Sequence, residues 1–162
     1  MGQIFGYGGF TKLALGYPVN INDMNIRTAT VDASADDGIE PGALVIATDT
    51  YNSVITTDAV GSVDNYNGKV LGIAVATNVK LDPCFPMSKD GIKWESGEAL
   101  GYAVTGEIAV KFTGTAPTPN ASAYYDIANG AFTTTEASNL ALPNMRFTGI
   151  TEGNLTVVRI LY

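Results

Sequence analysis

The sequence contains no histidine and only one cysteine, Cys84. Without an imidazole, Ser-His-Asp and Cys-His catalysis are excluded, and one thiol cannot supply the ligands of a Cys/His zinc site or form a disulfide within the chain. Charged residues are also scarce, at 15% against about 25% in an average soluble protein. An enzyme of this sequence would depend on carboxylates, Lys, Tyr or an activated Ser or Thr. We therefore predict a protein that is not an enzyme and needs no cofactor or metal.

Basic residues are outnumbered, nine against sixteen acidic ones, which gives a net charge of −7. A protein that neutralises nucleic-acid phosphates needs a basic patch, so we expect no nucleic-acid partner. No stretch approaches the roughly 20 apolar residues of a membrane-spanning helix, and the N-terminus lacks the pattern of a secretory signal. We expect no membrane partner. The length of 162 residues corresponds to one domain, which can bury a sufficient core without metals or disulfides.

The clearest structural signal is the period-two pattern of residues 102–112. Tyr102, Val104, Ile108, Val110 and Phe112 share one face, and Gly106 among them predicts a bend in a half-buried strand. Residues 69–77 alternate similarly, and their second face carries only small residues apart from Val70, which lets another layer approach closely. Further strands are predicted over residues 43–48, 53–58, 123–127, 131–135, 145–150 and 154–161.

Turn signals separate these strands. Asn67-Gly68, Asn129-Gly130 and Glu152-Gly153 favour tight turns, and only residues 136–142 have a reasonable helix propensity, over too short a length to be stable alone. Short strands at this spacing indicate an all-β fold, either a β-sandwich or a small β-barrel. We predict a single β domain over residues 38–162 with an irregular insertion at about 79–98. It is preceded by an N-terminal arm or lead-in over residues 1–37.

Candidate sites for chemistry are weak. Asp32, Asp36, Asp37 and Glu40 form the densest acidic cluster, which could be a calcium site, but a solvated loop is the favoured interpretation. Sixteen acids give no selectivity for a glycosidase pair. The glycines of residues 6–10 lack the strand and helix context of a phosphate-binding loop.

Two segments remain as candidate binding elements. The insertion carries Cys84, Phe85 and Trp94, and it is interpreted either as a binding loop or as a loop tucked against the sheet. Aromatic stacking of Trp94 and Tyr102 on sugar rings would suit a carbohydrate-binding module. The N-terminal segment contains Ile4, Phe5, Tyr7, Phe10 and Tyr17 among glycines. Such a composition is unlike a solvated tail, so it forms either an extra strand of its own domain or an arm docked on a neighbour.

Five segments in order carry a family resemblance. They read PGALVIAT (41–48), GKVLGIAVA (68–76), GYAVTGEIAVKF (101–112), AYYDIANGAFTT (123–134) and MRFTGITEGNLTVVRI (145–160). Together with the polar lead-in they resemble the decoration, or structural cement, proteins of tailed-bacteriophage heads. The resemblance covers roughly residues 41–160. The insertion at 82–95 departs from it.

The resemblance implies a β-rich, typically trimeric protein on the outer surface of the virion, which bridges major capsid protein subunits and stabilises the shell. It carries over no catalytic motif. The predicted partners are the major capsid protein and further copies of the chain. The candidate interface residues are Ile4, Phe5, Tyr7, Phe10, Tyr17, Phe85 and Trp94. The alternatives are a carbohydrate- or surface-binding β-sandwich module and, less favoured, a small hydrolase that uses carboxylates.

Overall fold

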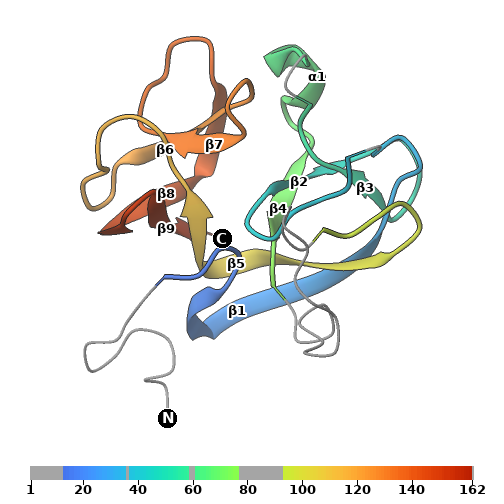
Figure 1. Ribbon diagram of the computed structural model, residues 1–162, viewed down its shortest axis with the longest axis horizontal. Helices are drawn as coiled ribbons and strands as arrows, with labels where there is room; N and C mark the ends of the chain where they lie inside the picture. The colour runs from blue at the N-terminus through green and yellow to red at the C-terminus, as the bar shows by residue number, and fades with distance from the viewer. Residues whose placement is uncertain (1–12, 36, 59–60, 77–92, 162) are drawn as a thin grey trace.

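The computed structural model describes residues 13–35, 37–58, 61–76 and 93–161 (Figure 1). The described chain consists mainly of strands, which confirms the all-β prediction. The elements are β1 (Pro18–Val31), β2 (Leu44–Ala47), β3 (Ser53–Ile55), α1 (Val63–Tyr66), β4 (Val70–Ala74), β5 (Ala99–Lys111), β6 (Ser122–Asp126), β7 (Ala131–Thr133), β8 (Leu140–Glu152) and β9 (Leu155–Ile160). Each predicted strand overlaps one of these.

The first five strands of the chain, β1 to β5, close into a barrel. In order of pairing, the described strands run β1-β3-β2-β4-β5-β9-β8-β6-β7, and β1 pairs additionally with β5. This additional pairing joins the two ends of the series β1, β3, β2, β4 and β5, which we call the first barrel. A small barrel was one of the two predicted architectures, and closure removes most of the unpaired edges of a sheet.

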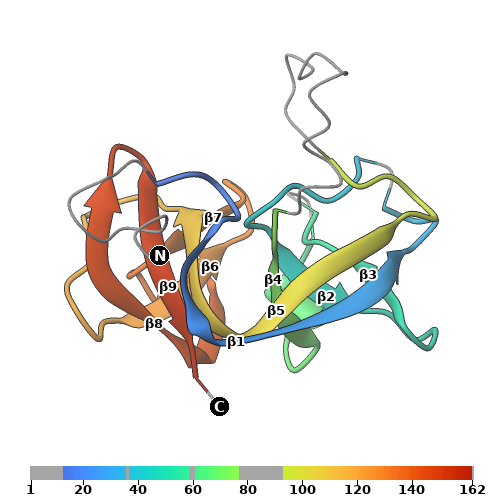
Figure 2. The same cartoon turned by 90° about the horizontal axis from the view of Figure 1, so that it is seen from below.

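The remaining strands form a second ring on the far half of β5. β9 pairs with β5 from Gly106 to Lys111, followed by β8, β6 and β7. A bridge between Phe112 and Phe132, with a hydrogen bond of 2.8 Å from the Thr113 amide to the Phe132 carbonyl, returns β7 to the end of β5. We call this ring the second barrel. Figure 2 shows the two barrels as separate lobes, with β1 and β5 passing from one to the other.

Strand β5 contributes one face to both cores. Leu100 and Tyr102 belong to the core of the first barrel, whereas Ile108 and Val110 belong to the core of the second. All four have the same parity along the strand, as the period-two pattern predicted. The change of barrel occurs at Gly106, whose φ of +121° lies in a region that residues with a Cβ rarely adopt. The predicted bend is therefore confirmed.

The two barrels pack against each other through apolar side chains. On β2 and β4, Val45 and Ala74 point into the first core, whereas Leu44, Ile46 and Ile73 belong to the cluster of the second barrel. All five side chains are fully buried, with an exposed fraction of 0%. Because both faces of these strands are buried, burial favours one fixed arrangement of the two lobes.

Gly72, on the small-residue face predicted for β4, lies against the backbone of the neighbouring strand. A Cβ at Gly72 would overlap the backbone carbonyl of Ala103 on β5. Neighbouring Ile73 pairs with Ala103 in the β4–β5 ladder, which holds the backbone of Ala103 beside Gly72. A glycine is required at this position because the obstacle is backbone, which cannot rotate away.

The one segment with a reasonable helix propensity forms no helix, as its short length led us to expect. Residues 136–142 were expected to have helix propensity, but β8 already begins at Leu140 and pairs with Tyr125 of β6. Tertiary pairing thus overrides a weak local preference. The structure instead contains α1, a single turn whose N-cap Ser62 accepts a hydrogen bond from the Asp64 amide at 3.4 Å. One turn is too short to produce a periodic sequence signal.

The predicted lead-in contains a full strand. β1 pairs with β5 from Pro18 to Thr30 and with β3 at Thr30 and Val31. Residues 18–31 are thus built into the same sheet as β2 to β9. Residues 1–12, and the insertion up to residue 92, lie outside the described residues, so the predicted arm and insertion stay predictions.

We expect Gly72→Ala to destabilise the protein by about 1–3 kcal/mol or more, because the added methyl overlaps backbone. Gly153→Ala is the matched control, since nothing lies within 4 Å of its Cβ position and only its φ of +60° is unfavourable, which costs about 1–2 kcal/mol. Urea unfolding curves would measure both. A smaller loss for Gly72→Ala than for Gly153→Ala would contradict the close approach of β4 and β5.

Candidate interaction surfaces

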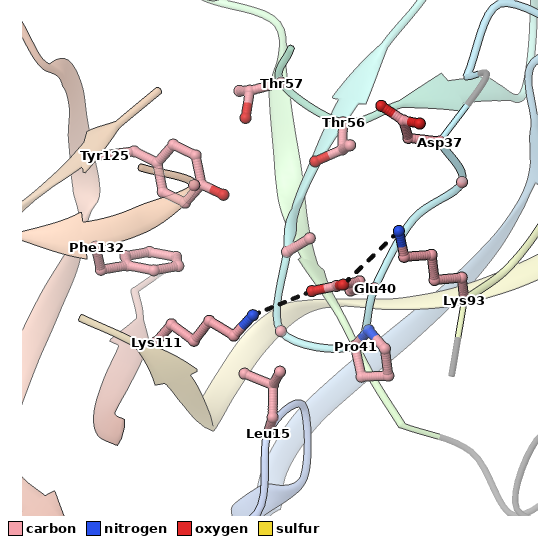
Figure 3. Close-up of a pocket in the computed structure, with 14 residues that line it drawn as sticks. Leu15, Asp37, Glu40, Pro41, Thr56, Thr57, Lys93, Lys111, Tyr125 and Phe132 are labelled. Carbon is pink, nitrogen blue, oxygen red and sulfur yellow. Dashed lines mark hydrogen bonds and ion pairs between the residues drawn. The ribbon is translucent and has the colours of Figure 1, made fainter. Parts of the chain in front are cut away.

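A cleft of about 160 Å³ lies between the two barrels (Figure 3). The first barrel contributes Glu40 and Pro41 before β2 and Thr57 after β3, and the second contributes Tyr125 and Phe132. Lys111 at the end of β5, Lys93 and Leu15 also line the cleft. The residues that line this cleft are far apart in the sequence and meet only after both barrels have formed. No local sequence motif therefore predicts the cleft.

Glu40 is the electrostatic centre of the cleft. Its carboxylate lies 3.2 Å from the Lys111 ammonium and 3.9 Å from that of Lys93. The three side chains are about a third to a half exposed. Ion pairs with this exposure contribute about 0–1 kcal/mol each. The main consequence of these ion pairs is that they orient the Lys93 and Lys111 side chains toward one carboxylate in the cleft.

Tyr125 closes the deep side of the cleft. Burial raises the pKa of Tyr125 to about 12, with smaller contributions from the negative charges of Glu40 and Asp126 in the same direction. A hydrogen bond with Thr57 partly offsets this rise. The ring packs edge-to-face on Phe132 with centroids 5.1 Å apart. At neutral pH the phenol stays protonated, so it is a poor general base and instead connects the second barrel to Thr57 of the first.

Residues 13–17 cross from one barrel to the other. The Leu13 amide donates to the Glu152 carboxylate at 2.7 Å on β8. The Gly16 amide donates to Ala109 of β5 at 2.8 Å, and its carbonyl accepts from Ala76, just after β4, at 2.8 Å. We call residues 13–17 the strap. It fixes the point at which the N-terminal segment leaves the two barrels.

The structure describes only some of the predicted interface residues. Ile4, Phe5, Tyr7, Phe10 and Phe85 lie outside the described residues. Tyr17 is half-buried and its carbonyl accepts from the Ala109 amide at 3.0 Å.

Trp94 is 2% exposed and packs in the core of the first barrel. Its amide and carbonyl exchange hydrogen bonds of 2.9 Å with Ile39. Tyr102, its expected companion in sugar stacking, is 6% exposed in the same core. In this fold neither ring offers a face to a ligand.

The acidic cluster separates into local contacts. Asp32 accepts hydrogen bonds from the Ser53 and Ser34 hydroxyls and the Ser34 amide, and these bonds lower the pKa of its carboxyl. Glu40 instead pairs with the two lysines, and Asp36 lies outside the described residues. Among the residues that the structure describes, no group of three or more His, Cys, Asp or Glu side chains is arranged to hold a metal. The described helix is not long and apolar enough to cross a membrane.

Sequence reasoning missed the exposed aromatic at the β2–β3 turn. Tyr51 is 98% exposed and precedes Asn52, which has a φ of +57°. An Asn at such a position is a recognisable turn signal, but nothing in the local sequence distinguishes an exposed tyrosine from a buried one. Ile26 and Ile150, each 49% exposed, Leu161 (40%) and Leu71 (37%) are the other large apolar side chains exposed among the described residues.

Comparisons with known proteins agree on one class. A family model described as "Structural cement protein (E217 gp24/Pam3 gp6)" matches residues 9–161. A solved chain from the capsid of the Myoviridae phage XM1 has a similar fold, with a TM-score of 0.67 and 19% identity over 96% of this chain and 94% of the other. No curated protein sequence matches.

We expect alkaline titration to reveal Tyr125. Because its pKa is raised, the neutral phenol stabilises the fold below pH 10, and this contribution is lost as the pH rises from 10 to about 12. Absorbance at 295 nm should show one tyrosine ionisation step near pH 12. This step should be absent from the titration curve of Tyr125→Phe. This variant should also lose about 0.5–1.5 kcal/mol of stability with the Thr57 hydrogen bond. An unchanged titration curve would contradict the buried position, and Tyr51→Phe, which removes an exposed phenol, is the control.

Proposed function

Since the chain belongs to the structural cement protein family of phages, we propose that it decorates the outer surface of a capsid and bridges neighbouring major capsid protein subunits. The family assignment makes it a capsid-associated structural protein of the virion. The observation that carries the proposal is the match over residues 9–161, which is nearly the whole chain. We further propose that the chain acts without catalysis.

The architecture is suited to bridging. Two barrels that share β5 and bury a common apolar interface transmit force through strand ladders rather than through a flexible linker. The strap adds hydrogen bonds to both barrels. A load applied to one lobe therefore reaches the other without a hinge of low stability.

The charge of the chain supports a location on the outer surface of the capsid. A net charge of −7 disfavours contact with the packaged nucleic acid, whose phosphates attract basic proteins. Among the basic side chains with described partners, Lys93 and Lys111 share the single carboxylate of Glu40, and Arg159 pairs with Glu107. A net negative charge also favours solubility before the chain binds.

The contacts that we propose for capsid and self-association are apolar. In the N-terminal segment they are Ile4, Phe5, Tyr7 and Phe10, with Phe85 in the insertion as a further candidate. Tyr51 extends this set, because a fully exposed tyrosine is a typical hot-spot residue of protein interfaces. We propose association as a homotrimer, so that apolar segments covered by neighbours account for the low charge content.

The purified chain should co-sediment with assembled heads that lack it and raise the temperature at which they are disrupted. Isolated capsid subunits should bind weakly, because a bridging site exists only where several subunits meet. Sedimentation and a thermal DNA-release assay would measure both effects. The proposal fails if the chain does not bind heads, or if saturated heads are disrupted at the same temperature as bare ones.

Deletion of residues 1–12 should weaken head binding or self-association at least tenfold, because it removes the apolar segment but leaves the strap in place. Tyr51→Ala tests the second contact separately. The circular dichroism spectrum and melting temperature should stay close to those of the full chain, since the described barrels retain their contacts. Unchanged binding and unchanged oligomeric state in the deletion variant would assign no interface role to this segment.

A further inference from the structure

One side of β1 is left without a partner strand over part of its length. The β1–β5 register is unbroken from Ile26 opposite Ala103 to Thr30 opposite Ala99. On the other side, β3 pairs with β1 only at Thr30 and Val31. In the described ranges, no strand pairs with this second side before Thr30. We call residues 26–29 on this side the open edge.

The direction of the backbone groups at the open edge follows from the neighbouring hydrogen bonds. The Val31 amide donates to Glu98 on the β5 side, at 3.0 Å, whereas the Thr30 amide donates to Asn52 on the β3 side, at 2.9 Å. Successive residues of an antiparallel strand alternate between the two sides. The amides and carbonyls of Ile26 and Thr28 therefore point away from β5, toward the open edge.

Exposed side chains flank these backbone groups. Ile26 is 49% exposed, and Arg27 and Thr28 are also exposed. Tyr51, 98% exposed, lies in the turn that leads into Ser53, the β3 residue opposite Thr30. A strand added along residues 26–28 would continue the line of β3 and end beside this turn. Figure 2 shows β1 at the outer margin of the molecule, where an added strand has access.

The first half of β1 is protected in the usual way. Register shifts occur between Pro18 and Asn20, between Asn20 and Asn25, and between Asn25 and Ile26. Bulges and charged residues such as Asp23 keep edge strands from pairing with other chains. The stretch that begins at Ile26 carries the charged Arg27 but has no register shift, so it is the part of β1 whose backbone can accept a strand.

We propose that the open edge of β1 accepts residues 1–12 of a second copy of the chain by β-strand addition. The inference rests on the proposed function, in which copies lie side by side on a shell. Residues 1–11 carry no charged side chain and include Ile4, Phe5, Tyr7 and Phe10, which are strand-forming types. Main-chain hydrogen bonds would provide affinity, and apolar contacts with Ile26 and Tyr51 would provide specificity.

The strap favours a neighbouring copy over the chain's own segment. Leu13 is bound to Glu152 in the second barrel, whereas the open edge lies beside residues 100–103 of β5 in the first barrel. Twelve extended residues span about 40 Å, which is long enough to leave one molecule and pair with the next. The segment of each copy would then occupy the open edge of its neighbour.

Intermolecular disulfide formation tests the pairing directly. In a Cys84→Ser background, one full-length chain carries Ile26→Cys, and a second carries Phe5→Cys, Tyr7→Cys or Phe10→Cys. Ile150→Cys is the matched acceptor control, because both isoleucines are 49% exposed. After mixing and mild oxidation, at least one arm position should give about tenfold more mixed dimer with Ile26→Cys than with Ile150→Cys. Equal yields, in solution and on heads, would overturn the inference.

A block of the open edge provides a second readout. Thr28→Pro removes an amide that points away from β5, so the β1–β5 ladder keeps its hydrogen bonds; Ile26→Lys places a charge on the same edge without affecting the backbone. Each variant should weaken self-association about tenfold, as measured by sedimentation equilibrium. Deletion of residues 1–12 from either variant should weaken self-association no further. If neither variant changes an association that the deletion abolishes, the segment docks elsewhere.

The two proposals fail in different ways. A chain that binds and stabilises heads but gives no preferred cross-link at Ile26 overturns the strand addition and leaves the cement function intact. A chain that cross-links at Ile26 but does not bind heads overturns the cement function instead. A disulfide between Ile26→Cys and an arm cysteine placed in the same molecule, in dilute monomer, would show that the open edge holds the chain's own segment and would also overturn the inference.

Discussion

The fold depends on one strand that belongs to two barrels. β5 pairs with β4 in its first half, with β9 in its second half and with β1 in both, so both rings close on the same backbone. The positive φ of Gly106 lets the strand change direction while its even-numbered side chains keep facing a core. Because each barrel closes on β5, its bend sets the angle between the lobes.

Further contacts add to this constraint. The outer faces of β2 and β4 are buried against the second barrel, Tyr125 reaches Thr57 across the cleft, and the strap hydrogen-bonds to both lobes. None of these contacts needs a metal, a disulfide or a buried charge. A chain poor in charge and rich in glycine is sufficient, because strand ladders and apolar packing supply the rigidity that a cement protein needs.

Much of the secondary structure was predictable, because half-buried strands alternate. Residues 102–112 and 69–77 showed this alternation, and the turn residues marked the ends of most strands. The lead-in strand β1 lacked the signal, since its residues 25–28 are exposed on both faces. The sharing of β5, the closure of each ring and the cleft around Glu40 depend on pairing between distant residues, which local patterns do not record. Trp94 illustrates the same limit: its sequence context left open both a binding loop and a loop tucked against the sheet, whereas its bridge to Ile39 places the ring in a core.

The central claim is that the chain binds the outside of a capsid as one rigid pair of barrels that contacts more than one major capsid protein subunit. A cryo-electron microscopy reconstruction of decorated heads tests it most directly. The account predicts exterior density into which both barrels fit in a single placement, with contacts to at least two capsid subunits. Density inside the shell, contacts to one subunit only, or a changed angle between the barrels would contradict it.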